Sequence, residues 1–196
     1  MMNKLLLLLL FAGGILSKAY GTVWYVNINA TGTNSGTSWT DAYTDLQSAI
    51  GASNFGDEIW VAAGTYKPTA TTSRTISFSI KNGTKVFGGF NGTETLVTQR
   101  NSVVNVTILS GEIATGSAND NSYNVVYFSN VGNQTKIDGF SILGGYNSTG
   151  SGAGVRSANS SPILDNCKII GNYADIGGGL SHGGSGNITI QNCLFE

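Results

Sequence analysis

Two short sequence motifs recur along this chain at nearly one interval. DGFSI at 138–142 matches DNCKI at 165–169, which lies 27 residues later, and the start of that segment matches QNC at 191–193 after 26 more. In a second register, GAGVRS at 152–157 matches GGGLSH at 177–182 at an offset of 25 residues. Self-similarity at a fixed period predicts one structural unit that is stacked repeatedly, as in a solenoid.

The repeating unit consists of short β-strands separated by turns rich in glycine and asparagine, with no helical segment between them. A leucine-rich repeat has a similar period but requires an LxxLxLxxN spacing, which this sequence lacks. A β-sandwich would need hairpin turns and longer alternating strands. A parallel β-helix fits best, because each turn supplies about three short strands that pair with the turns above and below at ~4.8 Å.

The alignment of the repeats also predicts which side chains stack on one another. One inward row would hold Phe140, Cys167 and Cys193, the next row Ile142, Ile169 and Phe195, and Asn166 would lie over Asn192 at a bend. Such rows of like residues are typical of solenoids, in which each repeat contacts only its neighbours.

The segment 22–57 precedes the repeats and predicts a strand followed by a capping helix. Apolar residues recur at helical spacing over 38–50, where Ser38 or Thr40 would cap the start and Gly51 the end. A helix here would cover the open first turn of the solenoid. We expect residues 58–196 to form the β-helix turns. Because the sequence ends within a predicted strand, we expect it to be a piece of a longer gene product.

Residues 1–21 have the pattern of a secretory signal peptide. Lys4 precedes the apolar run 5–12, and small residues follow it. The run is too short for the ~20 residues of a membrane span, so we expect a secreted chain with no span after cleavage. Export would make Cys167 and Cys193 candidates for a disulfide, although parallel side chains on adjacent turns favour free thiols.

Charge and motifs exclude several classes of function. The chain has 10 basic and 11 acidic residues, a formal net charge of -1 and no basic run, so we expect no nucleic-acid partner. No GxSxG, HExxH or phosphate-binding glycine loop occurs. His182 is the only histidine, and we expect it in a surface turn without a serine or cysteine partner.

Asp138 and Asp165 are the best carboxylate pair for catalysis, because the repeat stacks them on adjacent turns. They could share a cation, such as the calcium that a carbohydrate lyase would need beside an arginine or lysine base. Alternatively, each aspartate hydrogen-bonds nearby backbone amides at its bend, which we favour. We therefore assign no catalytic, cofactor-binding or metal-binding residue, and Asp138 and Asp165 remain weak catalytic candidates.

The linked segments DEIWVAAGTYKPT, FGGFNGTET, TILSGEI, DNSYNVVYF and IDGFSILGG resemble secreted right-handed parallel β-helix proteins with the pectin-lyase-like fold, and IIGNYADIGGGL resembles the repeat of chlamydial polymorphic outer-membrane proteins. The resemblance covers roughly residues 57–196. It implies an all-β, right-handed parallel β-helix at the bacterial cell surface or outer membrane. That family includes adhesins and polysaccharide-degrading enzymes on one scaffold, so the fold alone does not decide the activity.

Two functions follow as hypotheses. The first is a structural or adhesive surface module, which presents a repetitive polar face to an extracellular polysaccharide or a host or cell-surface protein. The second is a polysaccharide lyase or glycoside hydrolase that uses acids such as Asp138 and Asp165, with calcium as its cofactor. The lack of a convergent acid–base set favours the first.

Overall fold

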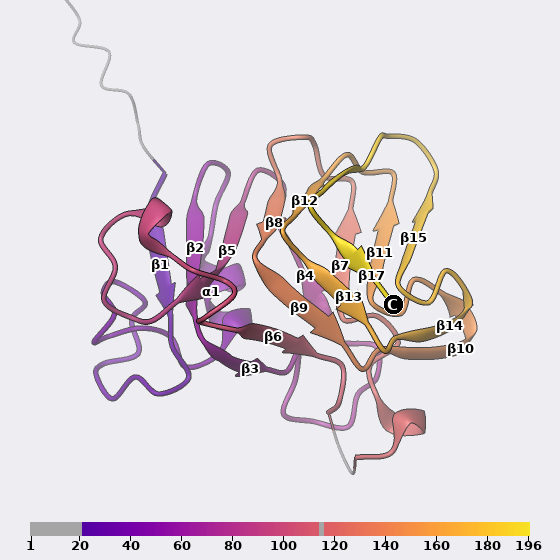
Figure 1. The fold of residues 1–196 in the computed structure, drawn as a ribbon, viewed down its shortest axis with the longest axis horizontal. Helices are drawn as coiled ribbons and strands as arrows, with labels where there is room; N and C mark the ends of the chain where they lie inside the picture. Colours follow the sequence, from indigo (N-terminus) through magenta and orange to yellow (C-terminus); the bar gives the residue numbers. More distant parts are fainter. Residues whose placement is uncertain (1–20, 114–115) are drawn as a thin grey trace, which may run out of the picture.

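The computed structural model describes residues 21–113 and 116–196, and it is built almost entirely from short parallel strands (Figure 1). A six-stranded sheet contains β1 (Val23–Val26), β2 (Glu58–Ala62), β5 (Lys85–Phe90), β8 (Lys136–Asp138), β12 (Ile163–Asp165) and β16 (Thr189–Gln191). We call this sheet A.

Two further sheets complete each turn. Sheet B contains β3 (Gly64–Tyr66), β6 (Thr107–Ser110), β9 (Phe140–Leu143), β13 (Lys168–Ile170) and β17 (Leu194–Phe195). Sheet C contains β4 (Phe78–Ser79), β7 (Val126–Ser129), β11 (Val155–Ala158) and β15 (Leu180–Gly183). A smaller pair, β10 (Tyr146–Ser151) and β14 (Tyr173–Ile176), lies between sheets B and C in the chain order.

The chain visits the three sheets in a fixed order, which is the signature of a parallel β-helix. In one turn it passes through β8, β9 and β11, and in the next through β12, β13 and β15, each strand pairing in parallel with its predecessor. The predicted all-β parallel β-helix is therefore confirmed. The helical elements are short: α1 (Leu46–Ala52), η1 (Val97–Gln99) and η2 (Ala118–Asp120).

Apolar side chains that point into the solenoid stack in rows along its axis. Ile142, Ile169 and Phe195 are register partners in sheet B, as the sequence predicts. Ile142 and Ile169 have no exposed surface. Burying each side chain stabilises the fold by about 1.5–3 kcal/mol relative to leaving it exposed. Phe195, in the last turn, is 41% exposed, so this row is buried only where a further turn covers it.

The capping helix is shorter than the sequence predicts, and its start is different. The pattern predicts a helix over 38–50, whereas α1 begins after Asp45, whose carboxylate accepts a hydrogen bond from the Ser48 amide at 2.8 Å. Ser38 instead closes a local turn, and Tyr43 bridges to β1. The helix still buries its apolar face and contacts β1, β2 and β4, so it covers the start of the solenoid.

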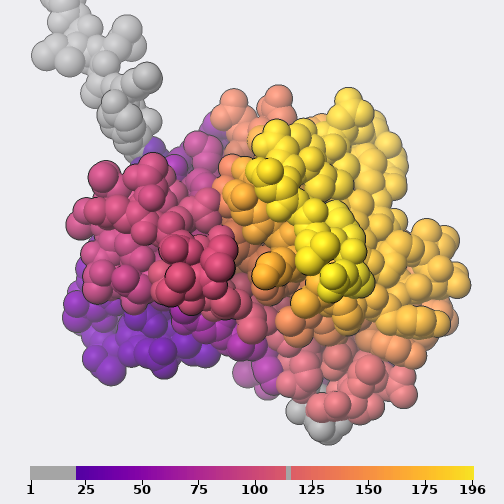
Figure 2. Space-filling model, viewed as in Figure 1, coloured from indigo at the N-terminus to yellow at the C-terminus, as the bar shows by residue number. Residues whose placement is uncertain are grey.

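The loop between β5 and β6 spans residues 91–106 and packs over the outer face of sheet A through Val97. Figure 2 shows this loop, in magenta, on the same face of the molecule as the last turn, in yellow. In residues 21–113 and 116–196, no helix has the length and apolar character to cross a bilayer. Residues 1–20 of the predicted signal peptide lie outside the described residues.

Candidate binding groove

The chain turns from sheet A into sheet B at one repeated position. Gly139, Asn166 and Asn192 follow the ends of β8, β12 and β16, and their φ angles are all positive, at 83°, 50° and 51°. Glycine has no Cβ to clash in this conformation, and asparagine is among the few other residues that adopt it. The predicted stacking of Asn166 and Asn192 at a bend is therefore confirmed, and the backbone conformation gives its reason.

Beside this bend, the outward-facing row of sheet A changes from aromatic to charged. Trp60, Phe87, Asp138 and Asp165 follow one another in strand register. The loop 91–106 covers the aromatic part of the row, where Trp60 and Phe87 are nearly buried. The charged part lies beside the same loop, because Arg100 of the loop contacts Asp138.

Four charged side chains form what we call the ion cluster: Arg100, Lys136, Asp138 and Asp165. Arg100 Nη2 lies 2.6 Å from Asp138 Oδ1, and Lys136 Nζ lies 2.8 Å from Asp138 Oδ2 and 2.9 Å from Asp165 Oδ2. Asp138 is only 2% exposed. Two positive and two negative charges balance within the cluster, as buried ionic groups require.

Arg100 and Lys136 also lie near the Phe87 ring. The guanidinium carbon of Arg100 is 5.3 Å from the ring centroid, and Lys136 Nζ is 6.0 Å from it. Arg100 Nη1 in addition donates to the Gly88 carbonyl at 3.0 Å. These contacts fix the position of the arginine, because its planar donors meet a carboxylate, a carbonyl and an aromatic face together.

The bend asparagines complete the hydrogen bonding of the carboxylates. Asn166 Nδ2 donates to Asp138 Oδ1 at 3.1 Å, and Asn192 Nδ2 donates to Asp165 Oδ1 at 3.0 Å. Every carboxylate oxygen of the pair thus already accepts from a side chain. Asp138 and Asp165 do share a cation, but it is the ammonium of Lys136.

This arrangement does not fit a calcium site. Calcium takes six to eight oxygen ligands, mostly carboxylates, carbonyls and water. Lys136 occupies the space between the two carboxylates, and the described residues contain no group of three or more acidic, histidine or cysteine side chains arranged to hold a metal. We therefore derive no chemistry through calcium at Asp138 and Asp165.

The cluster also keeps its groups charged. Burial lowers the pKa of Lys136, but hydrogen bonds from its ammonium to Asp138 and Asp165 outweigh this and hold the pKa above its usual value of 10.5. Burial raises the pKa of Asp165, yet hydrogen bonds from Lys136 and Asn192 bring it below its usual 3.8. A lysine held protonated is a poor general base, because a base must lose its proton before it acts.

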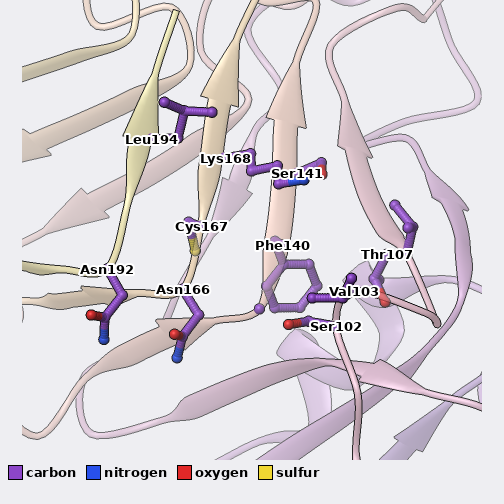
Figure 3. Close-up of a pocket in the computed structure, with 12 residues that line it drawn as sticks. Ser102, Val103, Thr107, Phe140, Ser141, Asn166, Cys167, Lys168, Asn192 and Leu194 are labelled. Carbon is purple, nitrogen blue, oxygen red and sulfur yellow. The ribbon is translucent and has the colours of Figure 1, made fainter.

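Next to the ion cluster lies a groove between the loop 91–106 and the last turns. One part has a volume of about 240 Å³ (Figure 3), and an adjoining part of about 480 Å³ includes Phe87 and Arg100. Ser102 and Asn166 line both parts, so the two parts adjoin each other. Polar groups from Ser102, Thr107, Ser141, Asn166, Lys168 and Asn192 and apolar groups from Val103, Val106 and Leu194 line the first part.

The loop wall is held by asparagine hydrogen bonds. Asn101 Oδ1 accepts from the amides of Val103 and Val104 at 3.1 Å each, and Asn105 Nδ2 donates to the Gly89 carbonyl at 3.2 Å. The two valines are 80% and 74% exposed. The groove therefore has an apolar rim on one side and a polar floor at the asparagine bend.

The sequence correctly predicts that Asp138 and Asp165 lie on adjacent turns, since the structure pairs them in register. It does not predict their cationic partners, Arg100 and Lys136. Lys136 carried a usable signal, because a residue two positions before Asp138 on the same strand faces the same side. Arg100 had none, since it comes from an irregular loop whose path no repeat predicts.

His182 does not lie in a surface turn, contrary to the sequence prediction. It is on β15, in register with Ser157 and in the same row as the buried Phe128. Its Nδ1 is 3.0 Å from Ser157 Oγ, and its Nε2 is 3.2 Å from the Gly186 carbonyl. Ser157, a partner that the sequence did not reveal, is almost fully buried. Ser157 and His182 therefore belong to a row of side chains that points into the solenoid.

The two cysteines are free thiols in this structure, as the sequence analysis favours.

Comparisons with known proteins found no matching family model and no matching curated protein. Among solved structures, "Crystal structure of pectate lyase Pel9A" overlaps the chain with a TM-score of 0.46 and 15% identity, over 91% of this chain and 50% of that one. The chain thus spans half the length of that protein. The overlap is loose, and the fold assignment rests on the chain's own parallel ladders.

Proposed function

We propose that this chain is an exported β-helix module of the bacterial cell surface that binds an extracellular carbohydrate in the groove without transforming it. One observation carries the proposal. All four carboxylate oxygens of Asp138 and Asp165 already accept hydrogen bonds from side chains of the protein. Such carboxylates position their neighbours, but they offer no free acid or base to a bound sugar.

The asparagine bend supplies what recognition needs. The amide nitrogens of Asn166 and Asn192 donate to the carboxylates, which leaves the two side-chain oxygens, about 4.8 Å apart on adjacent turns, as acceptors for a ligand. These oxygens accept no side-chain or backbone hydrogen bond among the described residues. Lys168 and Ser141 add donors, and Leu194 adds an apolar surface. Pockets that combine few fixed polar groups with apolar walls suit small rigid ligands such as sugar rings.

A second candidate is a polysaccharide lyase, and Arg100 is the observation that favours it. This arginine lies beside Asp138, next to the groove, where a cation could approach an acidic sugar. The candidate ranks lower because arginine stays protonated in proteins and the pKa of Lys136 is raised, so neither is ready to take a proton.

The test is a glycan-array screen of the purified chain, followed by calorimetric titration of any bound glycan. Asn166→Gly keeps the left-handed bend but removes the amide, and should weaken binding at least tenfold, about 1.4 kcal/mol. Asn130→Gly is the matched control, since Asn130 has a similar φ of 55° but lies at the end of β7, away from the groove. Equal affinities of the two variants, or no glycan binding at all, would refute the proposal.

The same glycans separate binding from turnover. We expect no rise in ultraviolet absorbance from unsaturated sugar products, with or without added calcium. A rise that Asp138→Asn abolishes, in a variant that is still folded by circular dichroism, would instead establish the lyase.

A further inference from the structure

Cys167 and Cys193 stack on each other in the last two turns of the solenoid. Their neighbours fix the register, because Asp165 pairs with Gln191 and Lys168 pairs with Leu194. The backbone ladder continues through the cysteines, where the Leu194 amide donates to the Cys167 carbonyl at 2.9 Å. Register partners on adjacent parallel strands lie about 4.8 Å apart, within the Cα separations of 4.4–6.8 Å that disulfides show.

The two thiols share one local arrangement. Cys167 Sγ donates to the Asp165 carbonyl at 3.2 Å, and Cys193 Sγ donates to the Gln191 carbonyl at 3.1 Å. Both side chains therefore leave the backbone in the same direction, toward the same row of the core, against which Cys193 packs. The chain has 2 cysteines in all, so each has the other as its only intramolecular partner.

The two sulfurs differ in access and in acidity. Cys167 is 1% exposed, whereas Cys193 is partly exposed. The neighbouring Cys167 thiol lowers the pKa of Cys193 to about 7, while the Cys193 thiol and burial raise the pKa of Cys167. Cys193 is thus the accessible thiol with thiolate character at neutral pH, and the thiolate is the form that attacks disulfides.

We propose that Cys167 and Cys193 are a redox site that closes into a disulfide between the last two turns, with a small-molecule disulfide as the oxidant. Cys193 attacks one sulfur of oxidised glutathione, whose S–S bond breaks and releases one glutathione. Cys167 then gives up its proton and attacks the Cys193 sulfur, which releases the second glutathione. The protein loses two protons and two electrons, and one oxidised glutathione takes them up and becomes two reduced molecules.

The site lies in the wall of the groove. Cys167, Asn192 and Leu194 all line its smaller part (Figure 3), and residues 192 and 194 flank Cys193 in the last turn. A bond between the cysteines would tie this turn to the one before it. The redox state would then set how firmly the groove wall is held, whatever ligand the groove takes.

The experiment is to incubate the folded chain with oxidised glutathione and to follow free thiols and intact mass. We expect both thiols to disappear together, with a mass loss of two hydrogens and no retained glutathione. In Cys167→Ser, Cys193 should instead keep one glutathione, because no second thiol displaces it. In Cys193→Ser, the buried Cys167 should stay reduced while the chain is folded.

Two results would overturn the proposal. One is a lasting glutathione adduct on the parent chain, since it would show that Cys167 cannot reach the Cys193 sulfur. The other is disulfide formation that occurs only in denaturant. Hydrogen exchange provides a second readout, because Leu194 and Phe195 should exchange more slowly in the oxidised chain. None of these measurements requires a bound carbohydrate, so they test this site separately from the proposed function.

Discussion

At the scale of single residues, Asp138 is the side chain on which the groove floor depends most. It is nearly buried, and it holds both Arg100 and Lys136. Removing one member of a buried ionic group leaves its partners with uncompensated charge. The resulting loss of stability is larger than the stability that the ion pair contributes relative to apolar residues at the same positions. Asp138 therefore has a structural role that does not require catalysis.

Asp138→Asn should lower the free energy of unfolding by about 3–5 kcal/mol, because it leaves Arg100 and Lys136 without their shared carboxylate. Urea unfolding measures this change. Lys67→Met is the matched control, since Lys67 and Glu112 form an ion pair at the surface, where such pairs contribute less than about 1 kcal/mol. Equal effects of the two substitutions would contradict our account of the ion cluster.

The ion cluster also predicts how stability depends on pH. The pKa of Asp165 is depressed in the folded state, so its contribution is present above its usual pKa of 3.8 and is lost as pH falls through the folded value. The pKa of Lys136 is raised, so its contribution is complete below 10.5 and is lost as pH rises through the folded value. We expect a stability plateau between these limits.

Urea midpoints measured across this range test the expectation. Asp165→Asn should show a smaller loss of stability in acid than the parent chain, and Lys136→Met a smaller loss in alkali. If the acid limb of Asp165→Asn matched that of the parent chain, other carboxylates with lowered pKa values, such as Asp57, would account for it.

The stacking of Asp138 and Asp165 could be predicted because a fixed period determines register. The partners of these carboxylates could not all be predicted. Arg100 reaches Asp138 from a loop whose course depends on Asn101, Asn105 and Gly89, and such local hydrogen bonds leave no periodic pattern.

At the scale of elements, α1 shows why helix boundaries are harder to predict than helix existence. The apolar spacing that indicates a helix continues back to Ala42, but Tyr43 is drawn into a bridge with β1. The backbone of Tyr43 therefore satisfies its hydrogen bonds with a strand. The helix can begin only after Asp45, whose side chain caps the first turn.

Asp45→Ala should destabilise the chain by about 1 kcal/mol, because it removes the acceptor for the Ser48 amide and hydroxyl. Thermal or urea unfolding would detect the loss. Asp45→Asn keeps an acceptor at the same position and should stay close to the parent. If alanine and asparagine were equally tolerated, packing of Leu46, Ala49 and Ile50 alone would hold the helix.

At the scale of the whole molecule, the solenoid could be predicted because each turn repeats one pattern and contacts only its neighbours. The two ends of the described structure differ. Beside β1, the Tyr25 amide donates to the Gly36 carbonyl and the Asn27 amide to the Tyr43 carbonyl, both at 2.9 Å, so this edge is covered. In the last turn, Ile190 and Phe195 are 43% and 41% exposed.

Because stability in a solenoid is close to a sum of nearest-neighbour terms, this difference predicts a gradient of local stability. Native-state hydrogen exchange of the 196-residue chain should be slowest in β8, β9, β12 and β13, which have paired strands on both sides, and fastest in β16 and β17, which pair on one side only among the described residues. The exchange of β1 should lie between these groups, since residues 36–43 cover its outer edge. Uniform exchange across all turns would mean that the chain unfolds as one cooperative unit, and the nearest-neighbour description would then fail for this solenoid.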